Sequence, residues 1–553
     1  MEPSREHLLS KLAWMSAPLA LYLFVLQRLW VDAPVWDDYG TVLDSVMRMM
    51  DAPSAKDWLA VVVAQHNEHR IATVRLISRG VAALFGRIDF RVLVLVGNLW
   101  FVGVFLLIWA EFRDAVPAPL FAAAAFLMFQ WSYYEAGIWT SGGLPNMGSV
   151  FFCFACLFFA TRGRWPAAAA SMLFAILAIG SSANGLFPLP IAATACAVQG
   201  KRERAWLFGA ASLGLWALYF WGYRSPAAHP SPMLALSSPL ATAQLFLIVI
   251  GGIIPGRWAP ILAGLSILAV LAWLFRKGVW KAHPTATLWI VFVLVSAAAA
   301  AAGRVGFGVF HASRYAIYST CLLVLAFLGV CEATRPWSRP KIAFAIVGAA
   351  AASFAISWMS WRDALLFSLN GHLLAKAVPA APDPSLARYF GMYFPNPAGS
   401  AQILLAAESH GLYVPKEQPV YPSSLRLTAA IAGSTHIGGS IDEVSVAGSR
   451  VTASGWTEIP ATVPGRTFSV FPSEGIALAM KVVTTDRSDA ARALRDSRLV
   501  FSGFRLELDY PSEEMARKIA ESLCVVVEAP GHSASVLSRT KVSCPPLPAR
   551  GPS

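Results

Sequence analysis

The sequence predicts a mainly α-helical bundle that crosses a membrane many times and carries a β-sandwich domain in its C-terminal part. Of the 553 residues, 56% are hydrophobic and only 14% are charged, whereas a soluble protein is about 45–50% apolar and about 25% charged. The apolar residues gather in runs that are long enough to cross a hydrocarbon core of about 30 Å. After residue 436 the pattern changes to short segments rich in β-branched residues.

Twelve apolar runs are candidates for membrane-spanning helices. The first run lacks a small-residue cleavage site and precedes many further runs, so we expect a retained helix and not a removed signal peptide. The runs cover residues 13–31, 91–110, 118–131, 147–161, 165–180, 185–199, 205–222, 238–254, 259–275, 285–302, 314–331 and 341–358.

Charges in the short connections predict the orientation of the bundle. The positive-inside rule places the basic connections and the N-terminus in the cytoplasm. If all twelve runs crossed, the basic pair Arg276-Lys277 would lie outside. The conflict disappears if the run 238–254 dips in and returns, or lies along the outer interface; eleven crossings then remain. The basic connections contain Arg162 and Arg164, Lys201, Arg202 and Arg204, Arg276, Lys277 and Lys281, and Arg335, Arg339 and Lys341.

This topology divides the chain into three parts. Residues 1–358 form the predicted transmembrane domain, with a long exterior loop at 32–90. Residues 359–435 form a connector with amphipathic segments that prolines interrupt, and 436–553 form the exterior β-sandwich domain. We expect the chemistry on the exterior side, because irregular polar backbone at membrane depth needs protein or a water-filled cavity around it.

The predicted β-domain consists of seven short, partly alternating segments, interrupted by one short helix near Ser512–Ser522. Cys524 and Cys544 both lie in this exterior domain, where an oxidising compartment permits a disulfide, and the sequence leaves open whether they are bridged. In an apolar run a buried thiol usually acts as a small hydrophobe. The cysteines in apolar runs are Cys153, Cys156, Cys196, Cys321 and Cys331.

An acidic pair, Asp37 and Asp38, begins the first exterior loop between Trp36 and Tyr39. A carboxylate at the mouth of a membrane cavity can act as a general base, because partial burial and an acidic neighbour raise its pKa. Either residue fits that role. The alternative is a helix cap or a solvated acidic loop.

The same loop contains the polar sequence QHNEHR at 65–70. As the start of an amphipathic helix on the membrane surface, it would place His66, His69 and Arg70 on neighbouring faces. Together with Glu68, these side chains could bind a donor phosphate, position an acceptor or hold a divalent ion. The offset differs from that of the HExxH zinc motif. The alternative is a hydrogen-bonded network that packs the loop against the bundle.

Two arginines mark another outer helix end. Arg304 and Arg314 flank a glycine-rich loop, and Arg314 begins a span beside Tyr315. The planar guanidinium suits phosphate oxygens, and a cation at membrane depth is costly without a partner such as a lipid phosphate. The alternative is that these side chains snorkel to the interface. The aromatic loop 131–146 is interpreted as part of an interfacial belt.

Together these features resemble the GT-C glycosyltransferases, integral membrane enzymes that take a sugar from a polyprenyl-phosphate donor on the exoplasmic face. The matching segments are Asp37-Asp38 just after the first helix, HNEHR at 66–70, SRY at 313–315, and the β-domain segments 442–456 and 497–510. The resemblance implies an inverting transfer in which Asp37 or Asp38 deprotonates an acceptor hydroxyl. The donor- and acceptor-binding residues that it implies are His66, Glu68, His69, Arg70, Arg304, Arg314 and Tyr315.

The resemblance also implies the partners and the location. The donor would be a polyprenyl-phosphate sugar, and the acceptor a cell-envelope glycolipid or polysaccharide that the β-domain helps to orient. The protein would lie in the bacterial inner membrane, in contact with its lipids, and act on the periplasmic side. No cofactor is certain, and a divalent cation is left open.

Two other functions stay open. A flippase for lipid-linked glycans should show internal repeats, paired broken helices and ionisable groups near mid-membrane, and the sequence shows no repeat and few charges in the runs. A non-catalytic glycan-binding membrane protein is the third reading. The net charge of +12 fits membrane topology, so no nucleic-acid partner is expected. No βαβ unit with a glycine-rich turn is predicted, which disfavours a nucleotide-sugar donor.

Overall fold

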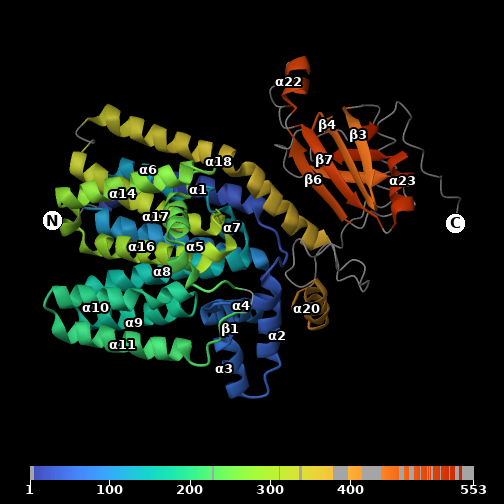
Figure 1. Ribbon diagram of the computed structural model, residues 1–553. Coiled ribbons are helices and arrows are strands. Elements are labelled where there is room, and N and C mark those ends of the chain that lie inside the picture. Colours follow the sequence, from blue (N-terminus) through green and yellow to red (C-terminus); the bar gives the residue numbers. More distant parts are fainter. Residues whose placement is uncertain are drawn as a thin grey trace. The chain divides into compact units, whose positions relative to one another are not determined.

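The structure is a computed structural model whose chain divides into two compact units, which are described separately (Figure 1). The first unit comprises Met1–Lys376, Tyr393–Pro395 and Gly399–Pro415, and the second comprises Ala377–Met392, Asn396–Ala398 and Lys416–Ser553. The residues that the structure describes are 5–226, 229–310, 312–335, 339–377, 397–413, 438–459, 466–471, 479–485, 487–494, 496, 499, 502–510, 512–521, 523–529 and 535–538.

All twelve apolar runs lie in helices, which confirms the predicted helical bundle. These are α1 (Arg5–Leu29), α5 (Phe90–Phe112), α6 (Ala118–Met128), α8 (Thr140–Thr161), α9 (Trp165–Ile179), α10 (Pro188–Val198), α11 (Arg202–Phe220), α13 (Pro239–Gly251), α14 (Ala259–Lys277), α16 (Pro284–Arg304), α17 (Ala316–Thr334) and α18 (Pro340–Ala377). Within the described residues, six helical segments are long and apolar enough to cross a membrane: those of α5, α8, α14, α16, α17 and α18. The chain is therefore a multi-pass membrane protein, and the number of eleven crossings stays a prediction.

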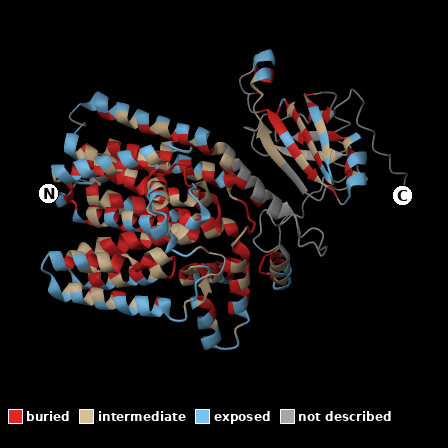
Figure 2. Cartoon of the chain, viewed as in Figure 1, coloured by how far each residue is buried: buried red, intermediate tan, exposed pale blue. Residues whose placement is uncertain are grey.

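The outer surface of the bundle is apolar. On α11, Trp206 is 79% exposed, and Leu213 and Leu218 are each 70% exposed. Figure 2 shows such exposed residues along the outer helices, around a buried interior. Contiguous apolar surface of this kind is rare on soluble monomers and marks a membrane or protein contact. It suits helices that face lipid.

Helix α13 lies at one end of the bundle. Its Leu245 packs with Ala301 and Val305, where α16 ends. Its last residue, Gly251, is so close to Pro260, in the first turn of α14, that a β-carbon there would overlap the Pro260 carbonyl. The short connection between α14 and α16 makes them antiparallel, so the start of α14 and the end of α16 share one end of the bundle. The last residue of α13 therefore lies near that end of the bundle, and Leu247 in the middle of α13 lies against Gly264 of α14. That the run 238–254 does not cross the membrane stays a prediction.

The first loop is mostly helical but contains a hairpin. Its elements are the π-helix η1 (Tyr39–Asp44), α2 (Ser45–Met50), α3 (Ala55–Val63), β1 (Gln65–His66), β2 (His69–Arg70) and α4 (Ala72–Phe85). The strands pair antiparallel, with His66 opposite His69, so the helix predicted over 65–70 is wrong. Asn67 stands in the turn at φ 49°, a left-handed conformation that Asn tolerates. The amphipathic helix begins only at Ala72.

Short helices connect the longer ones around the bundle. They are α7 (Tyr134–Ile138), η2 (Ala183–Leu186), α12 (Leu234–Ser237), α15 (Val279–Ala282), η3 (Val305–Phe307), η4 (Ser313–Tyr315) and α20 (Pro397–Ser409). Helix α18 continues to Ala377, so the first part of the predicted connector 359–435 is helical. Most of the rest of that connector lies outside the described residues.

A closed polar cluster lies where α16 begins. His283 precedes α16 and is buried between two carboxylates: its Nδ1 is 3.7 Å from an oxygen of Glu111 on α5, and its Nε2 is 2.7 Å from an oxygen of Glu332 on α17. The ring stacks on Phe112, with 4.2 Å between centroids, and Arg162 lies 3.8 Å from Glu111. We call these residues the closed cluster.

The second unit is a β-domain in which all seven predicted segments contain strands. The strands are β3 (Gly439–Ala447), β4 (Arg450–Thr457), β5 (Thr467–Phe471), β6 (Ala479–Thr485), β7 (Gly503–Asp509), β8 (Cys524–Glu528) and β9 (Ser535–Ser538). They form two antiparallel sheets, ordered β3-β4-β7-β6 and β5-β8-β9. Residues of both sheets, such as Val451, Leu508 and Val527, share one core with Ile519. This agrees with the predicted β-sandwich.

Two helices accompany the strands of the β-domain. Helix α23 (Glu513–Glu521) supplies Ile519 to the core and matches the helix predicted near Ser512–Ser522. Helix α22 (Ser488–Leu494) was not predicted. Cys524, the first residue of β8, is disulfide-bonded, and Cys544 lies outside the described residues. The five cysteines in the bundle are free and buried, as expected.

Candidate functional site

A cavity of about 690 Å³ lies where α16 ends. Its walls come from the first loop, α8, η2, α11, the Pro-rich segment after α11, the end of α16 and η4. The volume is within the range of pockets that hold small ligands, about 300–1,000 Å³. The predicted site residues that line it are Asp37, His66, Glu68, His69, Arg304, Arg314 and Tyr315. Asp38 and Arg70 are not part of the lining.

The two carboxylates of the acidic pair have different surroundings. Asp38 is 1% exposed, and its Oδ1 accepts hydrogen bonds from the Ser141 hydroxyl and from the Ser141 N–H at 2.9 Å. Its Oδ2 accepts from the Val35 N–H at 3.2 Å. Asp37 is half-buried and lines the cavity, and its carboxylate makes no hydrogen bond or ion pair with any residue that the structure describes. Of the two, only Asp37 is placed to meet a ligand.

The backbone around Asp37 is unusual. Trp36 has φ 46°, a conformation that costs about 1–3 kcal/mol for a bulky residue and persists only when its surroundings impose it. Its ring packs edge-on against Trp139, with 4.8 Å between centroids. The Asp37 carbonyl accepts from both the N–H and the hydroxyl of Thr41, each at 2.8 Å. These contacts turn the chain so that Asp37 faces the cavity and Asp38 faces the interior.

Asp38 joins the first loop to α8. Ser141 lies in the first turn of α8, where free N–H groups and the helix dipole favour a carboxylate. Burial raises the pKa of Asp38 to about 7, while the hydrogen bonds from Ser141 and Val35 oppose the rise. The helix-cap alternative therefore describes Asp38, although the helix concerned is distant in sequence. We interpret Asp38 as a positioning residue.

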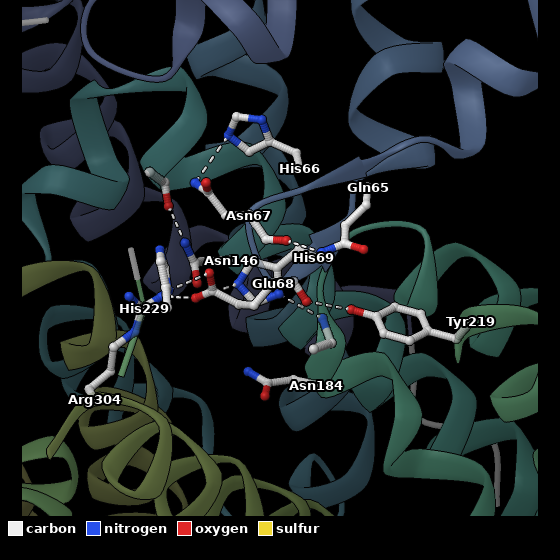
Figure 3. Close-up of polar contacts among 12 residues, drawn as sticks. Gln65, His66, Asn67, Glu68, His69, Asn146, Asn184, Tyr219, His229 and Arg304 are labelled. Atoms are coloured by element: carbon white, nitrogen blue, oxygen red, sulfur yellow. Dashed lines mark hydrogen bonds and ion pairs between the residues drawn. The ribbon is translucent and has the colours of Figure 1, made fainter. Parts of the chain in front are cut away.

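The hairpin turn holds the Glu68 carboxylate among three nitrogen-bearing side chains (Figure 3). Arg304 donates through Nη2 to Oε1. His69 Nε2 lies 3.5 Å from Oε1, and His229 Nδ1 lies 3.0 Å from Oε2. The Tyr219 hydroxyl donates to the Glu68 backbone carbonyl at 3.0 Å. The turn is thus fixed by residues from α11, α16 and the Pro-rich segment.

The contacts of His69 define its tautomer. The Ala183 N–H donates to His69 Nδ1 at 3.3 Å, so Nδ1 acts as an acceptor. In the neutral ring the proton is then on Nε2, which faces Glu68. In this tautomer the Nε2–H group of His69 lies next to the Glu68 carboxylate, with Nε2 3.5 Å from Oε1.

Burial keeps the hairpin histidines neutral. It lowers the pKa of His69 to about 4, and the nearby His66, His229 and Arg314 lower it further. Burial also lowers the pKa of His66, against the opposing charge of Asp37. At neutral pH these two histidines therefore add no permanent positive charge to the cavity, whereas Arg304 and Arg314 do.

Arg70 has a structural position outside the cavity lining. Its Nε donates to the Tyr219 carbonyl at 2.7 Å, its Nη1 to the Val63 carbonyl at 2.6 Å, and its Nη2 to the Trp221 carbonyl. Arg75 donates to two further carbonyls at the end of α3. Carbonyls at a helix end have no partner within the helix. We therefore interpret Arg70 as a positioning residue of the hairpin, in place of the ligand role expected from the sequence.

The two cavity arginines are each paired with a carboxylate. Arg314 donates to Glu135 Oε2 through its backbone N–H at 3.1 Å and through Nη1 at 3.4 Å. Its guanidinium also lies over the ring of Tyr315, 5.2 Å from the centroid. Arg304 binds Glu68, as above. The side chains are 18% and 27% exposed for Arg304 and Arg314, so they are inside the cavity wall, and snorkelling does not describe them.

The aromatic loop packs inside the bundle and does not form the expected interfacial belt. Trp131 and Tyr133 are each 1% exposed, and Trp139 donates through Nε1 to the Val35 carbonyl at 3.2 Å. Trp139 also lines the cavity. The loop therefore supports the acidic pair.

Several cavity residues were not among the predicted site residues. Ser141 and His229 contact the carboxylates of Asp38 and Glu68, Tyr219 binds the Glu68 backbone carbonyl, and Asn146 and Asn184 line the wall. Ser141 and Asn146 lie in the aromatic loop 131–146. Tyr219 lies in an apolar run, Asn184 between two runs, and His229 in a proline-rich loop. Within the described residues, no group of three or more His, Cys, Asp or Glu side chains is arranged to hold a metal ion.

Comparisons with known proteins give one solved structure. No family model matches the chain, and no curated protein matches it. The chain is similar to the crystal structure of ArnT from Cupriavidus metallidurans in the apo state, at 15% identity and a TM-score of 0.38. The alignment covers 77% of this chain and 81% of that one.

Proposed function

We propose that this protein is an inverting membrane glycosyltransferase that moves a sugar from a polyprenyl-phosphate donor to a hydroxyl of a cell-envelope glycan or glycolipid. The observation that carries the proposal is the unpaired Asp37 carboxylate, which lines the same cavity as Arg304 and Arg314. A base and two cations are the groups that this reaction needs. The open cavity would face the periplasm.

In the proposed reaction the Asp37 carboxylate takes the proton of the acceptor hydroxyl. The hydroxyl oxygen attacks the anomeric carbon from the side opposite the phosphate, and the bond between that carbon and the phosphate oxygen breaks. The lipid phosphate leaves with the electron pair. Arg304 and Arg314 stabilise the charge that develops on it. Asp38 keeps Asp37 in position from behind.

The carboxylates of Glu68 and Glu135 balance the charges of the two arginines. Neither guanidinium is therefore left uncompensated at membrane depth. A phosphate offers the guanidinium a second, bidentate partner. We expect donor binding to loosen these pairs.

One side of the cavity suits a lipid. The lining includes Ala299, Ala300 and Gly303 of α16 and the aromatic residues Trp216 and Phe220 of α11. Small residues on one helix leave room for a chain of isoprene units, and apolar burial stabilises it. The polar wall with Asp37 is left for the sugar and the acceptor.

A transfer assay with purified protein in detergent tests the proposal. Radiolabelled polyprenyl-phosphate sugars are offered with extracted envelope glycolipids to the wild type and to Asp37→Asn. We expect transfer by the wild type and a loss of about 100-fold or more in the variant, with unchanged thermal stability. Asp44→Asn is the matched control, because Asp44 lies outside the cavity lining and pairs with Arg48 on the loop surface at 3.6 Å. Full activity of Asp37→Asn, or no transfer from any donor, would contradict the proposal, and the second result would favour a flippase or a binding protein.

A further inference from the structure

Two asparagines on the cavity wall are not used by the proposed chemistry. Asn146 lies on α8, one turn after Ser141, which holds Asp38. Asn184 lies in η2 beside Ala183, whose N–H fixes the ring of His69. Each amide thus belongs to a rigid element that also positions a residue of the site. A side chain on a rigid element keeps its position, which suits a residue that recognises the shape of a ligand.

The amino groups of both amides are already bound to the protein. Asn146 Nδ2 donates to the Gly142 carbonyl at 2.7 Å, and because that carbonyl can only accept, the orientation of the amide is fixed. Asn184 Nδ2 donates to the hydroxyl of Tyr318, which is fully buried. The carbonyl oxygen Oδ1 of each amide points the other way. Neither oxygen has a hydrogen-bond partner within the described residues, and both side chains line the cavity (Figure 3).

An acceptor fixed in this way selects a ligand that donates. Both oxygens can only accept, so a ligand group that meets them must carry an O–H or N–H. The rings of Trp139 and Tyr315 complete the same cavity, and a sugar presents both donors and apolar ring faces. A ligand without the matching donor would leave a buried oxygen unsatisfied, which costs binding.

We propose that Asn146 and Asn184 are specificity-determining residues, which accept hydrogen bonds from two hydroxyl or amino groups of the transferred sugar. The inference rests on the proposed function and deepens it: the donor is a sugar with at least two hydrogen-bond donors toward this wall. Removing the matching group from the sugar lowers kcat/KM by about tenfold to a hundredfold. Each asparagine accepts a hydrogen bond from a different hydroxyl or amino group of the sugar.

Deoxy analogues of the accepted donor, with one hydroxyl or amino group removed at a time, test this inference. For each analogue the ratio of its kcat/KM to that of the full donor is measured with the wild type, Asn146→Ala and Asn184→Ala. We expect the wild type to reject two analogues. Asn146→Ala should accept one of them as well as the full donor, and Asn184→Ala should do so for the other. If an asparagine had only a structural role, its substitution would lower kcat/KM for the full donor and for the analogue alike. The ratio of the two values would then stay unchanged.

Asn98→Ala is the matched control. Asn98 is buried in α5, outside the cavity lining, and its amide is satisfied by Tyr22, Val94 and Gly137. This variant should lose stability and keep the wild-type ratios. If the wild type transfers sugar but both cavity variants keep its ratios for every analogue, this inference is overturned while the proposed function stands. If the wild type transfers nothing, both are overturned.

Discussion

The two ends of α16 hold polar clusters of similar composition and opposite design. At its start, His283 lies between Glu111 and Glu332 under the ring of Phe112, and the cluster is closed. At its end, Glu68 meets Arg304 and two histidines beside a cavity of about 690 Å³. The closed cluster brings three helices together around one imidazole. The cavity at the open end also has Asp37 in its lining, and the Asp37 carboxylate makes no hydrogen bond or ion pair with any residue that the structure describes. The difference is the reason why the proposed base is assigned to the open end.

The pKa values of His283 and His69, one at each end of α16, are shifted in opposite directions. Burial disfavours the charge on His283, but the carboxylates of Glu111 and Glu332 outweigh it and raise its pKa. At the open end burial dominates and lowers the pKa of His69 to about 4. A charged His283 stabilises the fold, whereas a neutral His69 has its Nε2–H group next to the Glu68 carboxylate. The number of carboxylates around each ring makes the difference.

The largest expected effect is on stability, at the closed cluster. His283→Gln removes the imidazole from Glu332 and leaves Glu111 with Arg162 alone, 3.8 Å away, which should cost about 3–5 kcal/mol. Thermal unfolding in detergent measures the loss. The control is His410→Gln, because His410 pairs with Asp51 on the surface at 3.2 Å and should matter little. If both variants lost the same amount of stability, the contrast between the buried closed cluster and a surface ion pair would be wrong.

The next effect concerns the hairpin. Arg70→Gln removes hydrogen bonds to three carbonyls and should cost about 1.5–3 kcal/mol of stability. Activity should fall because His66 and Glu68 lose their support. Arg48→Gln, at an exposed pair with Asp44, is the control. A higher KM for the donor without any loss of stability would restore Arg70 to the ligand role.

A smaller effect should separate binding from folding at the open end. Arg304→Gln should raise the KM for the donor by about tenfold to a hundredfold, because a charge-assisted hydrogen bond to phosphate is lost. Its thermal midpoint should also fall, because Glu68 loses the guanidinium that binds it, so the KM is measured at a temperature where the variant is folded. Arg257→Gln is the control, since Arg257 lies over Trp258 and outside the cavity lining. An unchanged KM would mean that Arg304 serves only to hold Glu68.

A further expected effect is a pH dependence due to Asp38. Its folded pKa of about 7 is above the usual value, so the folded state binds more protons than the unfolded state between about pH 4 and 7. Stability from this group is therefore present at low pH and declines as the pH rises to 7. Asp38→Asn should remove this decline in stability with pH. Each kcal/mol of stability corresponds to about 2–4 °C in the thermal midpoint. Thermal midpoints of both proteins across this range check it; parallel curves would refute the assignment.

The sequence by itself determined the elements of the fold. Runs of apolar residues gave every long helix of the bundle, because a helix in lipid needs about 20 of them in a row. Alternation of β-branched residues gave the seven strands, because the side-chain period of a strand is two. Local pattern also located Asp37, Arg304 and Arg314, as polar residues near the ends of apolar runs, and Glu68, as part of a polar sequence in the exterior loop.

Only the tertiary structure decided which of these residues face the cavity. Asp37 and Asp38 are neighbours with equal chemistry, and Ser141, about a hundred residues away, binds one and leaves the other free. The sequence predicts a helix over 65–70 where the structure has a hairpin. The hairpin depends on hydrogen bonds from Arg70 to carbonyls at the ends of α3 and α11. Pairing between distant segments leaves no mark in the local sequence, since it is set by the packing of the helices around it.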